Sequence, residues 1–215
     1  YTSQGMPSQN VNLYAKWAPN DVTLTLNDRD IIESKVYKVD SKLNLPTLQR
    51  SGYSFHGWYQ DKEGTKKFES TTMPTKNTTL YAKWTANTNT PYKVNHYFEK
   101  VNGGYDVESI SYEGTTDTLV NAPAISKVGF TFDGTNNSNV ISGNVSGDGS
   151  FILKMYYQRN IHTLTWKLNN GEEDVVSDVR FGSTITAPTP TRIGYTFTGW
   201  DSNVATTMPD EDITY

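Results

Sequence analysis

A twelve-residue motif occurs twice in this sequence, and its repetition constrains the fold more than any other feature. The stretch Met6–Trp17 recurs as Met73–Trp84, 67 residues later, and both copies end in Leu-Tyr-Ala-Lys-Trp. A third copy begins at Met208-Pro209 and runs to Tyr215. Repetition at this spacing predicts small modules arranged along the chain, each in contact mainly with its neighbours.

A second motif precedes the later copies of the first. Gly52–Trp58 reads Gly-Tyr-Ser-Phe-His-Gly-Trp and matches Gly194–Trp200, while Gly129–Gly134 is a weaker relative. Each of the three follows a proline-containing segment, which is Leu45-Pro46-Thr47, Ala122-Pro123-Ala124 or Ala187-Pro188-Thr189-Pro190. The sequence therefore predicts three modules with related beginnings.

Both motifs have the alternation of a strand with one buried face. Val11, Leu13, Ala15 and Trp17 alternate with polar residues and Tyr14, as a period-two pattern requires. The chain also contains 14 tyrosines, and tyrosine and threonine favour strands over helices. We expect a mainly β or α+β chain of small tandem modules in an elongated array.

Residues 19–86 resemble a known family, the Listeria–Bacteroides repeat, which is the B-repeat of internalin-type surface proteins. The resemblance is carried by Leu45-Pro46-Thr47, Gly52–Tyr59, Gly64, Met73-Pro74 and Leu80–Trp84. It implies a β-grasp-like module, that is, a small mixed sheet with a short helix or helical turn. Residues 161–215 resemble another copy truncated at its last strand, and residues 1–18 resemble the C-terminal strand of a preceding copy.

Residues 92–160 resemble the MucBP (mucin-binding-protein) repeats of Gram-positive surface proteins. The carrying segments are Tyr92–Phe98, Asn102–Tyr105, Gly114–Thr118 and Ser146–Tyr157. Residues 87–91 lie in a polar stretch that ends in proline, so they are expected to form a linker. The junction at Gln158–Ile161 has no such spacer. We therefore expect the second and third modules to be held together more rigidly than the first and second.

Composition excludes several classes of site. The absence of cysteine excludes disulfide frameworks, zinc–thiolate sites and cysteine nucleophiles. A net charge of −4 argues against a nucleic-acid partner. No apolar run approaches the length of about 18 residues that a membrane span needs. Since the chain starts and stops inside recognisable motifs, we expect it to be part of a longer protein.

No local pattern indicates catalysis, a cofactor or a metal. His56, His96 and His162 fall in different modules and lack convergent partners, so exposed strand or rim positions are expected. Acidic clusters at Asp28–Asp30, Glu172–Asp174 and Asp210–Asp212 are typical of solvated turns, although calcium binding is an alternative.

The residues with the clearest potential for recognition are tyrosines. Tyr14, Tyr81, Tyr156 and Tyr157 are expected to project from their strands. They either shield a sheet face by cross-strand pairing or form a platform for a host glycan or a surface protein, since tyrosine is enriched at recognition surfaces.

These features predict a non-catalytic repeat region of a secreted bacterial protein at the cell surface or cell wall. It would act as a spacer or stalk and contribute to adhesion to a host surface. Two alternatives stay open: a dedicated glycan- or mucin-binding adhesin module, and the non-catalytic part of a cell-wall-associated enzyme. We expect a monomer, with weak association through the strand Val11–Trp17, which could fill the open sheet edge of another copy's third module.

Overall fold

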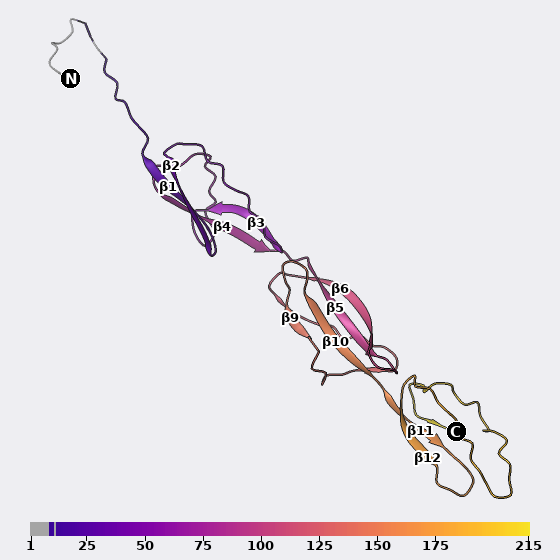
Figure 1. Cartoon of the computed structure of the whole chain (residues 1–215). Coiled ribbons are helices and arrows are strands. Elements are labelled where there is room, and N and C mark those ends of the chain that lie inside the picture. Colours follow the sequence, from indigo (N-terminus) through magenta and orange to yellow (C-terminus); the bar gives the residue numbers. More distant parts are fainter. Residues whose placement is uncertain (1–8, 11) are drawn as a thin grey trace. The chain divides into compact units, whose positions relative to one another are not determined.

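The structure is a computed structural model, and it describes residues 9, 10 and 12–215. Its contacts divide the chain into two compact units, with the boundary in the sequence between Thr85 and Ala86. Each unit is described by itself (Figure 1). Several small sheets follow one another along the sequence, which confirms the expected tandem β modules. Among the described residues there is no helix, and so none that could cross a membrane.

The first module is a four-stranded mixed sheet in the order β2-β1-β4-β3. Its strands are β1 (Asp21–Asp28), β2 (Ile31–Lys38), β3 (Tyr53–Tyr59) and β4 (Thr78–Ala86). β1 is antiparallel to β2 and parallel to β4, so the chain must cross over between β1 and β4. The core between this crossover and the sheet consists of Val22, Leu24, Leu43, Trp58, Phe68, Met73 and Leu80.

The short helix implied by the family resemblance is not found in the described chain. Residues 39–52, which connect β2 to β3, form no regular element apart from isolated bridges. Pro46 lies in their middle, and a proline removes a backbone donor and clashes with the preceding turn of a helix. Pro46 contributes instead its carbonyl, which accepts the indole N–H of Trp58 at 2.8 Å.

The second module has a four-stranded sheet in the order β6-β5-β10-β8 and a separate pair, β7 and β9. The strands are β5 (Thr90–Glu99), β6 (Tyr105–Gly114), β7 (Leu119–Asn121), β8 (Phe130–Phe132), β9 (Ser142–Asn144) and β10 (Ile152–Arg159). Alternate residues of β5 and β10 are buried, so one face of this sheet covers the core and the other faces solvent.

The third module has a three-stranded sheet in the order β12-β11-β13, made by β11 (Ile161–Trp166), β12 (Val175–Arg180) and β13 (Ile213–Thr214). Its hydrogen bonds repeat those of the first module. Trp200 donates its indole N–H to the carbonyl of Pro188 at 3.2 Å, as Trp58 does to Pro46. Met208 is 1% exposed and Met73 is 0% exposed. The tryptophan and methionine of the repeated motifs therefore make equivalent contacts in both modules, although Gly194–Trp200 forms no strand where the first module has β3.

The two junctions between modules differ in length. β5 begins at Thr90, which is buried and lies 2.7 Å, hydroxyl to hydroxyl, from Thr116. The expected linker of residues 87–91 is therefore too long, because only residues 87–89 lie outside strands. At the other junction Asn160 alone separates β10 from β11, and the two strands follow one another directly (Figure 1).

Candidate functional site

The four tyrosines that were expected to form a ligand surface belong to two different units of the chain. Tyr14 is 87% exposed in residues 12–18, which form no strand, and Val11 lies outside the described residues. Tyr81 is half-buried in β4 of the first module. Tyr156 and Tyr157 are neighbours in β10 of the second module, so their side chains point to opposite faces of the sheet.

Tyr157 points into the core, so the expectation that it projects outward is wrong. Its side chain is 2% exposed, and its ring stacks on Phe98 with 4.8 Å between centroids. Its hydroxyl accepts the backbone N–H of Ile125 at 3.1 Å and lies 3.0 Å from Nδ1 of His96. Burial raises the pKa of Tyr157, which keeps the hydroxyl protonated.

His96 is also buried, contrary to the exposed position expected for it. Its side chain is 0% exposed, and Nε2 has no hydrogen-bond partner among the described residues. Burial lowers the pKa of His96, while the nearby carboxylate of Glu108 opposes that shift. The imidazole therefore serves as a neutral part of the core.

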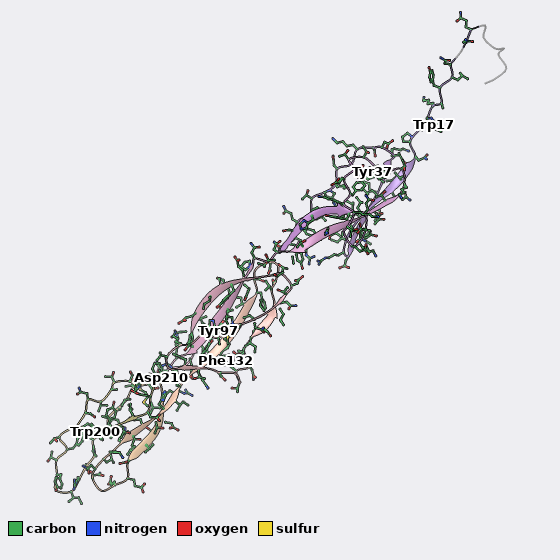
Figure 2. All side chains as sticks on the ribbon, turned by 180° about the vertical axis from the view of Figure 1, so that it is seen from behind. Trp17, Tyr37, Tyr97, Phe132, Trp200 and Asp210 are labelled. Atoms are coloured by element: carbon green, nitrogen blue, oxygen red, sulfur yellow. The ribbon has the colours of Figure 1, made fainter. Side chains whose placement is uncertain are left out.

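Tyr156 lies on the outer face of the same sheet, where it belongs to a cluster of three tyrosines. Its ring stacks on that of Tyr97 with a centroid distance of 4.5 Å and an interplanar angle of 8°. Tyr105 meets Tyr156 edge-on, with 5.0 Å between centroids. We call Tyr97, Tyr105 and Tyr156 the tyrosine platform; Figure 2 labels Tyr97 within it.

A glycine turn has the same conformation in all three modules. Gly52, Gly129 and Gly194 have φ angles of 78°, 79° and 78°. In each case the next residue donates its N–H to the carbonyl three positions earlier, at 3.0–3.1 Å. Glycine favours this turn because the third position of a type II turn needs a positive φ.

In the second module this glycine turn binds the third module through Asp210. The Asp210 carboxylate accepts the backbone N–H of Gly129 at 2.8 Å and the side-chain amide of Asn160 at 2.7 Å. Nε2 of His162 lies 2.8 Å from the same carboxylate. Hydrogen bonds from Asn160, His162 and Gly129 lower the pKa of Asp210. Figure 2 shows Asp210 at the end of the third module that adjoins the second.

Arg159 adds a second set of contacts across the same junction. Its guanidinium donates to the carbonyl of Glu99 at 2.8 Å and to that of Phe181 at 2.7 Å. It also lies 5.1 Å from the ring centroid of Phe130, which in turn meets Phe181 edge-on. Phe130 and Glu99 belong to the second module and Phe181 to the third, so Arg159 contacts both. We call the contacts of Asp210 and Arg159 the joint.

Sequence reasoning missed the joint, because it placed Asp210 in a solvated turn and His162 at an exposed strand position. A signal was present in the repeat. The residue after Met-Pro is Thr75 in the first module and Asp210 in the third, and the strand residue two positions before the shared leucine is Val22 in one and His162 in the other. Both members of the His162–Asp210 pair thus change together between the two copies.

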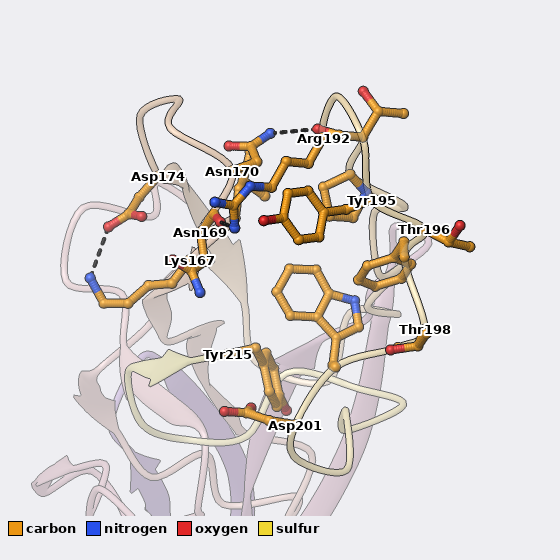
Figure 3. A pocket seen from close by; sticks show the side chains of 16 residues that line it. Lys167, Asn169, Asn170, Asp174, Arg192, Tyr195, Thr196, Thr198, Asp201 and Tyr215 are labelled. Atoms are coloured by element: carbon orange, nitrogen blue, oxygen red, sulfur yellow. Dashed lines mark hydrogen bonds and ion pairs between the residues drawn. The ribbon is translucent and has the colours of Figure 1, made fainter.

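The third module also has an open groove with a volume of about 700 Å³ (Figure 3). Tyr195, Phe197 and Trp200 are among the residues that line it, and the guanidinium of Arg192 lies 4.4 Å from the Tyr195 ring centroid. In the first module Phe55, the counterpart of Phe197, is covered by Trp84 at 5.0 Å between centroids. Addition of the strand Val11–Trp17 from another copy to the open sheet edge of the third module stays a prediction.

None of these clusters has the geometry of a catalytic centre. His56 is exposed in β3, His96 is buried in the second module, and His162 belongs to the joint. Within residues 9, 10 and 12–215, no group of three or more His, Cys, Asp or Glu side chains could hold a metal ion. The clusters consist of packing contacts, contacts between the second and third modules, and exposed aromatic side chains.

Comparison with known proteins identifies the repeated modules. The family model of the Listeria-Bacteroides repeat domain matches residues 21–83 and 162–214. These two matches correspond to the first and third modules, and together they include more than half of the chain.

The relatives that match at the level of sequence include the following three proteins. A putative membrane protein of Evansella cellulosilytica is 34% identical over 205 residues, covering 88% of this chain and 29% of that protein. A putative Gly-rich membrane protein of the same organism is 30% identical over 208 residues, covering 90% of this chain and 23% of that protein. Internalin H of Listeria monocytogenes is 34% identical over 92 residues, covering 41% of this chain and 17% of that protein.

The similarity to solved structures is low, as one of them illustrates. The type 2 repeat of the mucus binding protein MUB from Lactobacillus reuteri is matched over 65% of this chain and 99% of that chain, with 8% identity and a TM-score of 0.16. The three sequence relatives are longer proteins, and this chain spans less than a third of the length of each.

Proposed function

The chain belongs to the Listeria-Bacteroides repeat family, and from this premise we propose that it is a non-catalytic spacer region of a bacterial cell-surface protein. The joint between the second and third modules is the observation that carries the proposal. Neighbouring domains move relative to one another unless their interface holds them. A spacer that keeps a distal domain away from the cell wall needs such an interface.

The chemistry of the joint suits this role. Asp210 and Arg159 together hold backbone and side-chain groups from both modules, at distances of 2.7–2.8 Å. Hydrogen bonds that involve an ionised group are stronger than neutral ones. A salt bridge of 3.4 Å between Glu99 of the second module and Arg180 of the third adds to them. Only Asn160 lies between the two strands that the joint connects.

Because the chain contains no cysteine of its own, two introduced cysteines can be spin-labelled selectively in the full chain. Glu113→Cys and Asp178→Cys place spin labels on exposed strand positions of the second and third modules. Double electron–electron resonance should give a narrow distance distribution that Asp210→Ala broadens. Glu211→Ala, which removes the exposed neighbouring carboxylate, is the matched control and should leave the distribution narrow.

A broad distribution in the doubly labelled chain that keeps Asp210 and Glu211 would contradict the spacer function, because the modules would then move independently. Identical distributions for Asp210→Ala and Glu211→Ala would show that the contacts of Asp210 do not hold the two modules together. The spacer role would serve an adhesin or a cell-wall-associated enzyme equally well, since it concerns the region between their other domains.

Adhesion is the second candidate function, and the tyrosine platform is the observation that favours it. Exposed tyrosine provides an apolar ring and a polar hydroxyl with little loss of conformational entropy on binding. Tyr105 is 40% exposed, so the platform is accessible on the solvent-facing side of the sheet.

A further inference from the structure

We infer that the tyrosine platform and the small pocket beside it form a binding site for a neutral pyranose sugar. The inference deepens the adhesive function proposed above and rests on it, but it does not require the joint to be rigid. Its elements are the rings of Tyr97, Tyr105 and Tyr156, together with the polar groups at the end of β10.

The platform is held in place before any ligand binds. Tyr97 and Tyr156 lie opposite each other on the parallel strands β5 and β10, and their nearly parallel rings fix each other's orientation. Tyr105 comes from β6 and meets both rings edge-on, at 5.0 and 6.3 Å between centroids. A side chain already fixed by packing loses little entropy when it binds a ligand.

A pocket of about 110 Å³ adjoins the platform and is lined by Tyr105, Tyr156 and Gln158, among other residues. It is smaller than the roughly 300 Å³ at which pockets for drug-sized ligands begin. The pocket therefore suits part of a sugar ring rather than a large organic ligand.

The charges around this pocket are satisfied within the protein. Glu99 pairs with Arg180 at 3.4 Å, and Arg159 donates to two backbone carbonyls. Asp133 accepts the hydroxyl and the N–H of Thr135. The groups left for a ligand are the exposed amide of Gln158 and the tyrosine hydroxyls. The pocket consequently matches a ligand with hydroxyl groups and no net charge.

The same arrangement matches the two sides of a pyranose. One face of such a ring presents C–H bonds with weak positive character, which pack on the negative face of an aromatic ring. Its edges carry hydroxyls that exchange hydrogen bonds with amides and phenols. Gln158 and the tyrosine hydroxyls supply these partners beside the rings.

A protein partner fits this face less well. The outward-facing residues around the platform include the polar Lys93, Asn95, Ser109 and Lys154 and the apolar Val107 and Ile152, which follow from the alternation and pairing of β5, β6 and β10. A stable protein interface buries roughly 800 Å² on each partner around an apolar core. Three tyrosine rings with polar residues such as Lys93, Asn95 and Lys154 on the same face are too small an apolar core to provide one.

Saturation-transfer NMR on the full chain tests the inference. The probes are methyl β-galactopyranoside and methyl N-acetyl-β-glucosaminide, with N-acetylneuraminic acid as a charged comparison. At least one neutral probe should receive saturation and shift the backbone amides of β5, β6 and β10. Tyr105→Ala should weaken this binding about tenfold, which corresponds to about 1.4 kcal/mol. Gln158→Ala should weaken it in the same direction.

Tyr195→Ala is the matched control, because Tyr195 is an exposed tyrosine of the third module, outside the platform. Its binding should equal that of the unsubstituted chain, and backbone NMR spectra show whether each variant is folded. The inference is overturned if neither neutral probe binds in the tens of millimolar range. Preference for the charged sugar, or equal losses in Tyr105→Ala and Tyr195→Ala, would also overturn it.

The outcomes separate this site from the adhesive and spacer functions. If the full chain adheres to host glycans but Tyr105→Ala leaves that adhesion unchanged, the site is wrong and adhesion stands. If no adhesion occurs while a neutral sugar binds the platform, adhesion fails and the site stands. A narrow distance distribution between the spin labels keeps the spacer function in either case.

Discussion

The carboxylate of Asp210 accepts a hydrogen bond from the backbone N–H of Gly129, which lies 81 residues earlier in the sequence, at 2.8 Å. The two residues belong to different modules, and the contact joins a glycine turn that all three modules share to a carboxylate that the first module lacks. The first module has Thr75 in the corresponding position. The joint is therefore specific to the pairing of the second and third modules.

Gly129→Ala should open the joint, whereas Gly194→Ala should not. Both glycines have φ near +78°, so alanine at either costs about 1–2 kcal/mol in backbone strain. At Gly129 a Cβ would also lie 2.0 Å from the Phe181 ring, while at Gly194 it would meet no atom within 4 Å. Thermal unfolding and the spin-label distances should both change more in Gly129→Ala. Equal changes in the two variants would show that the Phe181 contact does not form.

The second module should lose stability in mild acid because of His96. Burial lowers the folded-state pKa of His96 below its ordinary value of 6.5, so the unfolded chain binds a proton first as the pH falls. The stabilising contribution is complete above pH 6.5 and is lost as the pH drops toward the lowered pKa. Urea unfolding followed by NMR of β5 and β10 amides should show this loss.

His56→Ala is the control for this pH dependence, because His56 is exposed in another module. It should leave the acid sensitivity of the second module unchanged, and His96→Phe should reduce that sensitivity. An unfolding free energy of the second module that stays constant between neutral and mildly acidic pH would contradict the buried neutral imidazole.

Met73→Ala and Met208→Ala should destabilise their own modules by similar amounts. Both side chains are within 1% of complete burial, and truncating a buried methionine costs about 2–5 kcal/mol. Chemical denaturation with module-specific NMR signals measures each effect, and Met73→Leu should cost less than about 1.5 kcal/mol because it keeps the volume. A negligible effect at either methionine would show that this methionine does not contribute to the core of its module.

The sequence predicts the modules well because repetition and alternation are local patterns. Leu80 and Trp58, chosen by period-two alternation and by the aromatic motif, lie in the core of the first module. The helix implied by the family resemblance is absent from the segment around Pro46, because proline disfavours a helix interior. The sequence does not show which of Tyr156 and Tyr157 faces the core, because both residues of the pair are aromatic and either ring could point inward.

The joint depends on contacts that no short pattern encodes. His162 and Asp210 are 48 residues apart, and an acidic cluster is typical of a solvated turn unless a distant donor approaches it. The paired replacements between repeats, Val22 by His162 and Thr75 by Asp210, are a local trace of that approach.

Amide hydrogen exchange at Gly129 and Gly194 in the full chain tests the joint most directly. The two glycines occupy the same turn with the same φ, but Gly129 is buried and donates to Asp210, whereas Gly194 is exposed. The joint predicts slow exchange at Gly129, fast exchange at Gly194, and loss of the Gly129 protection in Asp210→Ala. Equally fast exchange at both glycines in the unsubstituted chain would contradict it.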